Sequence, residues 1–308
     1  MTKSSSGSIS TPSSAVTIFA PAKVNLILRI LDRRADGFHN LWSLMQTVGL
    51  EDEIAIQCSP HHADIKLQCD SLSLSTDQTN LVYRAAAAVL QHSGLKVGVE
   101  IALIKRIPMG AGLGGGSSDA AATIIGLNRL LNLGWSVMKM AQVGQMLGSD
   151  VPFFFFAPSA TVTGRGEQVN AIRVTGSRWV VLVNPGFPVE TKWAYQQLSA
   201  TRSVVQPLSD THARLGRAIH LSWEQVIDVA ENDFETPVFN AHPVLRELKQ
   251  QLLTEGAEVA LLSGSGATIF GVFKNEAGAQ QARARFQTNP QLKVFVVPAG
   301  SGPLICKS

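Results

Sequence analysis

Glycine is concentrated in one short segment, which is the strongest chemical signal in the sequence. From Pro108 to Ala121 the chain reads PMGAGLGGGSSDAA, with glycine at five of the seven positions from 110 to 116. A strand-like segment precedes these glycines and a helix-like segment follows them. Glycine lets backbone N–H groups approach an anion closely, and a helix start adds unpaired donors and the positive end of its dipole. The pattern therefore favours a phosphate-binding loop over a flexible turn.

Two other phosphate-binding patterns fit this segment less well. Gly110, Gly112 and Gly115 satisfy the GxGxxG pattern of dinucleotide-binding folds, which makes a dehydrogenase an alternative. That fold expects an acidic residue about 20 positions further on to hold the ribose. No acidic residue lies between Asp119 and Asp150, so the dehydrogenase is disfavoured. A Walker A loop is excluded because the chain contains no GxxxxGK[ST].

A lysine and an aspartate outside this loop are candidates for the reacting groups of a kinase. Such an enzyme must align or deprotonate a hydroxyl and offset charge on the transferred phosphoryl group, and a carboxylate beside a lysine can do both. Asp150 follows a helix stop at Gly148 and precedes Val151-Pro152, which predicts a loop position. Lys23 lies in a strand pattern, on the same face as Asn25. Taken singly, a turn aspartate and a strand-surface lysine remain alternatives.

Periodicity indicates which segments position these residues. Strands are expected over residues 16–31, 41–48, 53–57, 97–107 and 179–183, with further strands around AEVALL and up to Val297. In the first strand one face is expected to carry Val16, Ile18, Ala20, Ala22, Val24, Leu26, Leu28 and Ile30. Helices are expected over residues 80–93, between the caps Ser117 or Ser118 and Gly134, and from Ser136 to Gly148. Two more are expected after Pro243 and after the cap Ser222, which has Gln225 three residues on.

The order of these segments predicts an α+β protein of two domains. A length of 308 residues exceeds the usual size of one domain. Distinct motifs become sparse after the segment 160–178, where we expect the domain boundary. The predicted parts are a disordered polar tail (1–15), an N-terminal domain with the glycine loop (16–170) and a C-terminal domain (171–308).

Composition disfavours several other classes of protein. The longest apolar runs are far shorter than the roughly 20 residues that cross a bilayer, and the N-terminus lacks a secretory or transit pattern, so we expect a cytoplasmic protein without a membrane partner. The net charge is +3 and no basic stripe occurs, which argues against nucleic-acid binding. Cys58, Cys69 and Cys306 form no CxxC pair, so free thiols and no structural metal are expected.

The glycine loop resembles the ATP loop of the GHMP kinase superfamily, and further motifs extend this resemblance from about residue 16 to 273. These motifs are PAKVNLIL (21–28), DGFHNL (36–41), GSDVPFF (148–154), NPGFPVETKWAY (184–195), NDFE (232–235) and LSGSGATIFGVF (262–273). Together they are similar to the kinases that act on methylerythritol linked to cytidine diphosphate, in the non-mevalonate route to isoprenoid precursors. The resemblance implies a ribosomal-protein-S5-like N-terminal domain, a ferredoxin-like C-terminal domain, and ATP and Mg²⁺ as cofactors.

The resemblance also implies roles for individual residues. Asp150 corresponds to the catalytic base and contacts the substrate, Lys23 polarises the acceptor 2-hydroxyl and steadies the Asp150 carboxylate, and Asn25 helps to orient the substrate. The implied ATP-binding residues are Pro108, Met109, Gly110, Ala111, Gly112, Leu113, Gly114, Gly115, Gly116, Ser117 and Ser118.

A pocket for cytidine is implied by four further positions. Phe38, His39, Thr191 and Tyr195 match the family's pocket, where aromatic rings form a flat slot and hydrogen bonds read the base edge. The family usually has tyrosine at position 38, so stacking is kept here but a phenol hydrogen bond is lost. Taken singly, core aromatics and a turn histidine are alternative interpretations of these residues.

Some alternatives stay open. Another GHMP kinase, of the homoserine or mevalonate type, would lack the cytosine slot, and a catalytically inactive nucleotide-binding protein would not need Lys23 or Asp150. Gly264 and Gly266 predict either a second loop that closes over phosphates or a plain β-turn. We expect a monomer or a weak homodimer.

Overall fold

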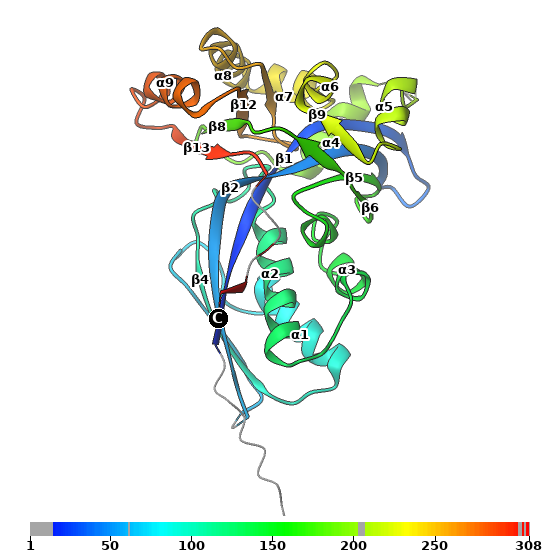
Figure 1. Ribbon diagram of the computed structural model, residues 1–308, viewed down its shortest axis with the longest axis vertical. Helices are drawn as coiled ribbons and strands as arrows, with labels where there is room; N and C mark the ends of the chain where they lie inside the picture. The colour runs from blue at the N-terminus through cyan, green and yellow to red at the C-terminus, as the bar shows by residue number, and fades with distance from the viewer. Residues whose placement is uncertain (1–14, 61, 203–206, 301–303, 305, 308) are drawn as a thin grey trace, which may run out of the picture.

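The computed structural model describes residues 15–60, 62–202, 207–300, 304 and 306–307. In Figure 1 the first half of the chain forms the lower part, where helices α1 to α3 lie beside a sheet, and most of the second half forms a layer above it. Strands β1 and β2 run from one part into the other. The predicted α+β class is confirmed. No helix in the described ranges combines the length and apolar character that crossing a bilayer requires.

The elements follow one another in three groups. The first group is β1 (Ala15–Arg33), β2 (His39–Ser59), β3 (Ile65–Cys69), α1 (Leu81–Ser93), β4 (Gly98–Ile104), α2 (Gly115–Leu130), α3 (Val137–Gln145) and the 3₁₀ helix η1 (Pro152–Phe155). The second is β5 (Ser159–Gly164), β6 (Gln168–Ala171), β7 (Arg173–Thr175), β8 (Trp179–Asn184), α4 (Thr191–Thr201), α5 (Asp210–Leu215), β9 (His220–Ser222) and α6 (Trp223–Ile227). The third is β10 (Glu231–Asn232), α7 (Glu235–Ala241), α8 (Pro243–Thr254), β11 (Val259–Leu262), β12 (Ile269–Phe273), α9 (Glu276–Phe286), β13 (Lys293–Pro298) and β14 (Cys306–Lys307).

The long antiparallel pair of β1 and β2 forms the centre of the first sheet. Its strand order is β10-β1-β2-β4-β3, with β14 on β1 and β5 and β6 on β2. The two strand segments predicted over residues 41–48 and 53–57 are one strand, so their separation was wrong. The polar residues between them read as a loop, but Asp52 is buried and its carboxylate accepts hydrogen bonds from the backbone N–H groups of Arg106 and Ile107 at 2.5 and 2.9 Å.

The single apolar face predicted for the first strand was also wrong. Register shifts lie between Pro21 and Ala22 and again between residues 25 and 27. An extra residue at a bulge turns the following side chains to the other face of the strand. Ile18 and Leu28 therefore belong to one hydrophobic cluster, whereas Val24 belongs to a second. As a result, β1 is buried on both faces at its centre.

The helix after the glycine loop starts earlier than expected. Its N-cap is Gly114 in the left-handed region, with φ 70°, and Ser117 and Ser118 lie inside the first turn and are not the caps. The helix ends at Leu130, before the predicted stop at Gly134. The predicted start of the next helix at Ser136 is confirmed, and the Ser136 side chain caps this helix by accepting a hydrogen bond from the N–H of Lys139.

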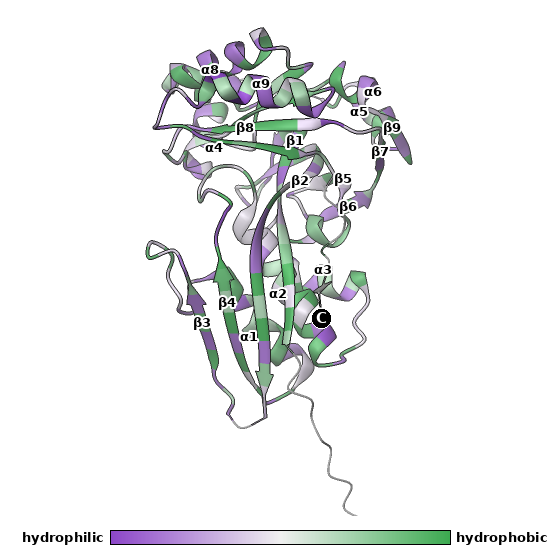
Figure 2. Cartoon of the chain, turned by 60° about the vertical axis from the view of Figure 1, so that its left-hand side comes forward, coloured by the Kyte–Doolittle hydropathy of each residue, from purple (hydrophilic) through white to green (hydrophobic). Residues whose placement is uncertain are grey.

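A second sheet organises the C-terminal part. Its strands are antiparallel in the order β11-β12-β8-β13, and helices α8 and α9 pack against it. Figure 2 shows β8 in the colour of hydrophobic residues, whereas α8 and α9 also carry hydrophilic ones. The predicted cap of α6 is confirmed as a capping box between Ser222 and Gln225. The proposed domain boundary at residues 170 and 171 falls at the end of β6. Residues 1–14 of the predicted tail lie outside the described residues, and Ala15 already pairs in β1.

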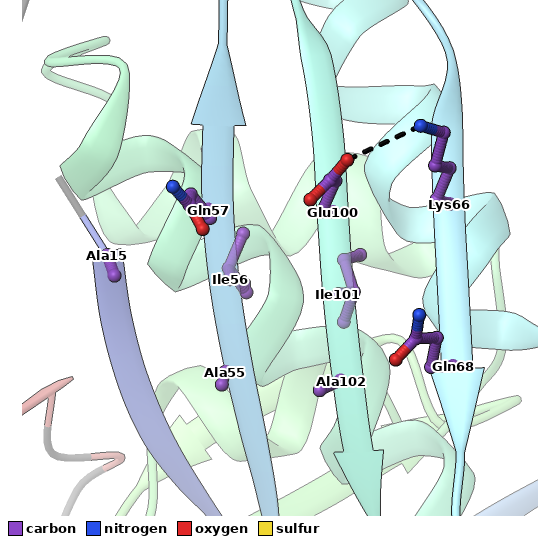
Figure 3. A pocket seen from close by; sticks show the side chains of 9 residues that line it. All are labelled: Ala15, Ala55, Ile56, Gln57, Lys66, Gln68, Glu100, Ile101 and Ala102. Atoms are coloured by element: carbon purple, nitrogen blue, oxygen red, sulfur yellow. Dashed lines mark hydrogen bonds and ion pairs between the residues drawn. The ribbon is translucent and has the colours of Figure 1, made fainter. Parts of the chain in front are cut away.

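The first sheet also has an open face with a shallow groove of about 390 Å³ (Figure 3). Helices lie behind the sheet in this view. An ion pair between Lys66 Nζ and Glu100 Oε1, 3.4 Å apart, crosses the groove. The remaining lining is Ala15, Ala55, Ile56, Gln57, Gln68, Ile101 and Ala102. Glu100, the one acid in this lining, is paired with Lys66.

Candidate active site

The fold brings the two predicted reacting groups together. Lys23 on β1 and Asp150, in the turn before η1, lie 3.4 Å apart between Nζ and Oδ2. The Lys23 side chain is 4% exposed, whereas that of Asp150 is 33% exposed. The lysine is therefore held in place, while the carboxylate is accessible to a bound molecule.

A chain of hydrogen bonds fixes the lysine. Lys23 Nζ donates to Asn25 Oδ1 at 2.7 Å and to the carbonyl oxygen of Gly112 at 3.1 Å. Asn25 Nδ2 donates to Ser43 Oγ at 2.9 Å, and that hydroxyl donates to the carbonyl oxygen of Ile27 at 2.7 Å. The predicted common side of Lys23 and Asn25 is confirmed by their hydrogen bond. Asn25 orients Lys23 in this structure, and its contact with a substrate stays a prediction.

The glycine loop makes contacts that only glycine permits. Gly112 has φ +77°, and a Cβ atom there would lie 2.0 Å from the carbonyl oxygen of Ser263. At Gly114, with φ +70°, a Cβ atom would lie 2.9 Å from Lys23 Cγ. The loop also accepts a hydrogen bond from the Lys23 backbone N–H through the Leu113 carbonyl, at 2.9 Å. The loop thus fits closely between Lys23 and the C-terminal part of the chain.

This loop lines a cavity of about 570 Å³. Ten of the eleven residues predicted to bind ATP, Pro108 to Ser117, line this cavity. The eleventh, Ser118, does not. The other lining residues are Leu74, Thr79, Asn80, Leu81, Val82, Lys105, Ile107, Asp119 and Thr191. Apolar side chains therefore lie next to a loop of backbone donors, an arrangement suited to a nucleotide with its phosphates on the loop.

The second glycine cluster packs against the first. Ser263 Oγ donates to the Gly112 carbonyl at 3.0 Å, and the position of a Cβ on Gly264 lies 3.5 Å from Lys23 Nζ. Asn232 on β10 donates to the carbonyl oxygens of Leu262 and Gly264 at 2.7 and 2.8 Å. The C-terminal part thereby supports the glycine loop, and closure over phosphates stays a prediction.

A second cavity, of about 790 Å³, contains the residues predicted to bind cytidine. Phe38, His39, Thr191 and Tyr195 all line it, together with Arg33, Gly37, Ser149, Arg165, Lys192, Gln196 and Ser199. Thr191 lines both cavities, so the two adjoin. Three of its lining residues are basic, which suits a ligand with negative charge.

The aromatic groups in this cavity contact one another and a basic side chain. The His39 ring stacks on Tyr195, with centroids 4.9 Å apart, and the Arg165 guanidinium lies 4.0 Å from the centre of the Phe38 ring. Phe38 is 53% exposed. Thr191 Oγ1 lies 2.9 Å from Ser265 Oγ. The residues predicted to bind cytidine are therefore together, and their stacking on a base stays a prediction.

Environment also sets the protonation of two of these groups. Burial, with a smaller effect of the Asp150 carboxylate, raises the pKa of Tyr195, so its phenol keeps its proton and can donate. Desolvation, assisted by Arg33, lowers the pKa of His39. A neutral imidazole has one donor and one acceptor nitrogen, which suits recognition of a base edge.

Sequence reasoning missed a buried charged cluster beside the glycine loop. Lys105 Nζ contacts the carboxylates of both Asp52 and Asp119, the latter at 2.7 Å. Lys105 follows the apolar run IALI, and Asp119 precedes AAAT. A charged residue beside an apolar stretch was the available signal. Such a residue is expected to be buried, and a buried charge is normally paired with an opposite charge. Arg165 was missed as well, since nothing in its sequence context places it over Phe38.

Comparisons with known proteins agree with this geometry. The family model described as GHMP kinases N terminal domain matches residues 80–157, and that described as GHMP kinases C terminal matches residues 206–291. A 4-diphosphocytidyl-2-C-methyl-D-erythritol kinase of Syntrophotalea carbinolica is 41% identical over 281 residues, which cover 91% of this chain and 98% of that protein. A 4-diphosphocytidyl-2-C-methyl-D-erythritol kinase of Geobacter metallireducens is 42% identical over 285 residues, which cover 92% of this chain and 99% of that protein.

Solved structures show the same relationship. A crystal structure of 4-(cytidine 5'-diphospho)-2C-methyl-D-erythritol kinase superposes with a TM-score of 0.75 at 30% identity, covering 93% of this chain and 100% of that one. The homoserine kinase from Cytophaga hutchinsonii has a TM-score of 0.71 at 19% identity, covering 97% and 98%, which indicates a shared fold only. From its sequence identity over most of its length and both domain matches, the chain belongs to the 4-diphosphocytidyl-2-C-methyl-D-erythritol kinase family of the GHMP kinases.

Proposed function

We propose that this chain is an ATP-dependent kinase that phosphorylates the 2-hydroxyl of 4-diphosphocytidyl-2-C-methyl-D-erythritol, a step in isoprenoid precursor synthesis. The observation that carries the proposal is the Lys23–Asp150 pair. Its lysine contacts Gly112 of the glycine-loop cavity, and its aspartate follows Ser149 of the second cavity. One cavity suits a nucleotide, and the other has aromatic rings and basic side chains for a cytidine diphosphate. Cytoplasmic location and a monomeric or weakly dimeric state are parts of the proposal that rest on the sequence.

In the proposed mechanism Asp150 accepts the proton of the 2-hydroxyl as its oxygen bonds to the γ-phosphorus of ATP. The bond from that phosphorus to the bridging oxygen breaks, and ADP leaves. Lys23, held by Asn25 and Gly112, offsets negative charge on the reacting oxygens. Backbone N–H groups of the glycine loop and the first turn of α2 hold the phosphates.

Mg²⁺ enters this scheme with ATP as its complex. The part of the chain that the structure describes contains no group of three or more acidic, histidine or cysteine side chains that could hold a metal. Kinase sites commonly bind Mg²⁺ through one or two carboxylates plus substrate phosphates, so such a group is not required. The ion supplies charge neutralisation for the phosphates.

The proposal is tested by ATP consumption with a panel of acceptors. The panel contains the cytidine-linked substrate, free methylerythritol phosphate, homoserine and mevalonate. We expect turnover with the first alone, because only it fills the second cavity. Equal use of homoserine or mevalonate would instead favour another GHMP kinase, and ATP binding without turnover on any acceptor would favour a nucleotide-binding protein.

Replacing Phe38 with alanine should raise KM for the cytidine substrate by roughly 5-fold to 150-fold, since stacking on an aromatic ring contributes about 1 to 3 kcal/mol per base. KM for ATP should change much less, because Phe38 lines the second cavity and is absent from the lining of the glycine-loop cavity. Steady-state kinetics with each substrate varied in turn measures both values. An unchanged KM for the cytidine substrate would remove Phe38 from the pocket.

Phe38→Tyr is the matched variant. If the phenol that most of the family carries makes a useful hydrogen bond, tyrosine lowers this KM modestly; if only stacking matters, KM stays the same. Leu72→Ala, at a fully exposed side chain outside both cavities, controls for general effects of substitution.

A further inference from the structure

Lys105, Asp52 and Asp119 form a buried cluster of charges from three different segments. The side chains of these residues are 7%, 0% and 2% exposed. Asp52 lies on β2, Lys105 follows β4, and Asp119 lies in the second turn of α2. With both carboxylates ionised the cluster carries a net charge of −1, and with one of them protonated it is neutral.

Asp119 has one oxygen that the protein leaves without a donor. Its Oδ2 pairs with Lys105, but among the described residues its buried Oδ1 has no hydrogen-bond partner. Burial, together with the Asp52 carboxylate, raises the pKa of Asp119 to about 7. A proton on Asp119 would supply a donor for a hydrogen bond between the two carboxyl groups. The other titratable groups nearby are the Cys69 thiol and Asp70, whose Oδ1 accepts from the Lys105 backbone N–H at 2.9 Å.

The cluster lies where the phosphates of a nucleotide would bring negative charge. Lys105 and Asp119 are the charged residues in the lining of the glycine-loop cavity, within the described ranges. Lys105 Nζ lies 3.3 Å from the position of a Cβ on Gly115, the first residue of α2. This helix start is the place that favours phosphate. A polyanion there opposes an extra negative charge on Asp119 and competes with Asp119 for Lys105.

We propose that Asp119 is a positioning residue of the ATP site, which takes up a proton when ATP binds and so frees Lys105 to face the phosphates. The neutral carboxyl group then donates to Asp52, and the cluster no longer repels the nucleotide. No bond is made or broken apart from that to the proton, which comes from solvent. The proposal rests on ATP binding at the glycine loop, as in the proposed function, and does not depend on the acceptor substrate.

The sign of the pH dependence follows from this uptake. Binding that takes up a proton weakens as pH rises through the pKa of the free protein, which is about 7 for Asp119. If ATP raises this pKa by about one unit, affinity should fall roughly tenfold between about pH 6 and pH 9. At about pH 7.5 the uptake should then be about half a proton per ATP.

Titration calorimetry of MgATP into the full chain, without acceptor, measures this uptake. The observed enthalpy is compared in HEPES and Tris, whose ionisation enthalpies differ, at several pH values. We expect proton uptake in the parent protein and its loss in Asp119→Asn, whose amide is neutral at every pH. Comparing parent and variant cancels the ionisation of ATP itself. Asp64→Asn, at an exposed carboxylate before β3, is the matched control and should keep the parent's uptake.

Each outcome decides the proposal. The proposal is supported if the parent and Asp64→Asn take up a proton on binding MgATP and Asp119→Asn does not. No uptake by the parent, or equal uptake by Asp119→Asn, overturns it while leaving ATP binding and the proposed function intact. If MgATP does not bind the parent at all, both the proposal for Asp119 and the proposed function are contradicted. At neutral and higher pH MgATP itself is fully ionised, so the absence of uptake by the parent there contradicts the proposal even if Asp119→Asn does not fold.

Discussion

Asp150→Asn should lower kcat by at least about 10²-fold while leaving the affinity for ATP nearly unchanged. Asparagine keeps the shape of the side chain but cannot accept the hydroxyl proton. In the structure Asp150 contacts Lys23 and lies 33% exposed, whereas ATP is proposed to bind mainly through the glycine loop. The effect should therefore fall on the chemical step. Steady-state kinetics, with ATP affinity measured separately by calorimetry, tests both parts.

Asp228→Asn is the matched control for this change. Asp228 is an exposed carboxylate at the C-cap of α6 and lines neither cavity. Its kcat should stay within about twofold of the parent, since exposed charges away from a site contribute little. A kcat for Asp150→Asn within about tenfold of the parent would contradict the assignment of Asp150 as the base.

Gly112→Ala should lower both stability and turnover, and by more than other alanine substitutions in the loop. The new Cβ would lie 2.0 Å from the Ser263 carbonyl oxygen, a backbone atom that cannot rotate away. The residue also has φ +77°, which by itself costs a non-glycine residue about 1 to 2 kcal/mol. We expect the free energy of unfolding to fall by about 2 kcal/mol or more. Movement of the loop by about 1 Å would also lower kcat by roughly 10²-fold, because the Gly112 carbonyl accepts from Lys23.

Gly116→Ala is the control within the same loop. Its Cβ would lie 3.4 Å from Leu81 Cδ1, an ordinary contact, and its position is inside α2, where alanine is favoured over glycine by about 1 kcal/mol. Urea denaturation should therefore show unchanged or slightly increased stability for Gly116→Ala. If Gly112→Ala were as stable as the parent, the close packing of the two glycine loops would be wrong.

Local sequence was enough to predict the parts of the site that depend on neighbours in the chain. The glycine loop between a strand and a helix, a helix start at Ser136 and the Ser222 cap with Gln225 were all predicted and are present. The common side of Lys23 and Asn25 follows from strand alternation over two residues, which no bulge interrupts. Order and content of the motifs also sufficed to identify the family.

Tertiary structure alone decided what depends on partners far away in the chain. Bulges in β1 moved its apolar residues into two clusters, because strand register is set by the pairing with β2 and by packing on both faces. Asp52 is part of a strand because backbone donors of the segment after β4 hold its carboxylate, and local periodicity cannot show this. The stacking of His39 on Tyr195 and the pairing of Lys105 with two carboxylates likewise join separate segments. The sequence determined which groups are available for phosphate transfer, whereas the fold determined the charge and the access that each group has, since burial and opposite charges act only through space.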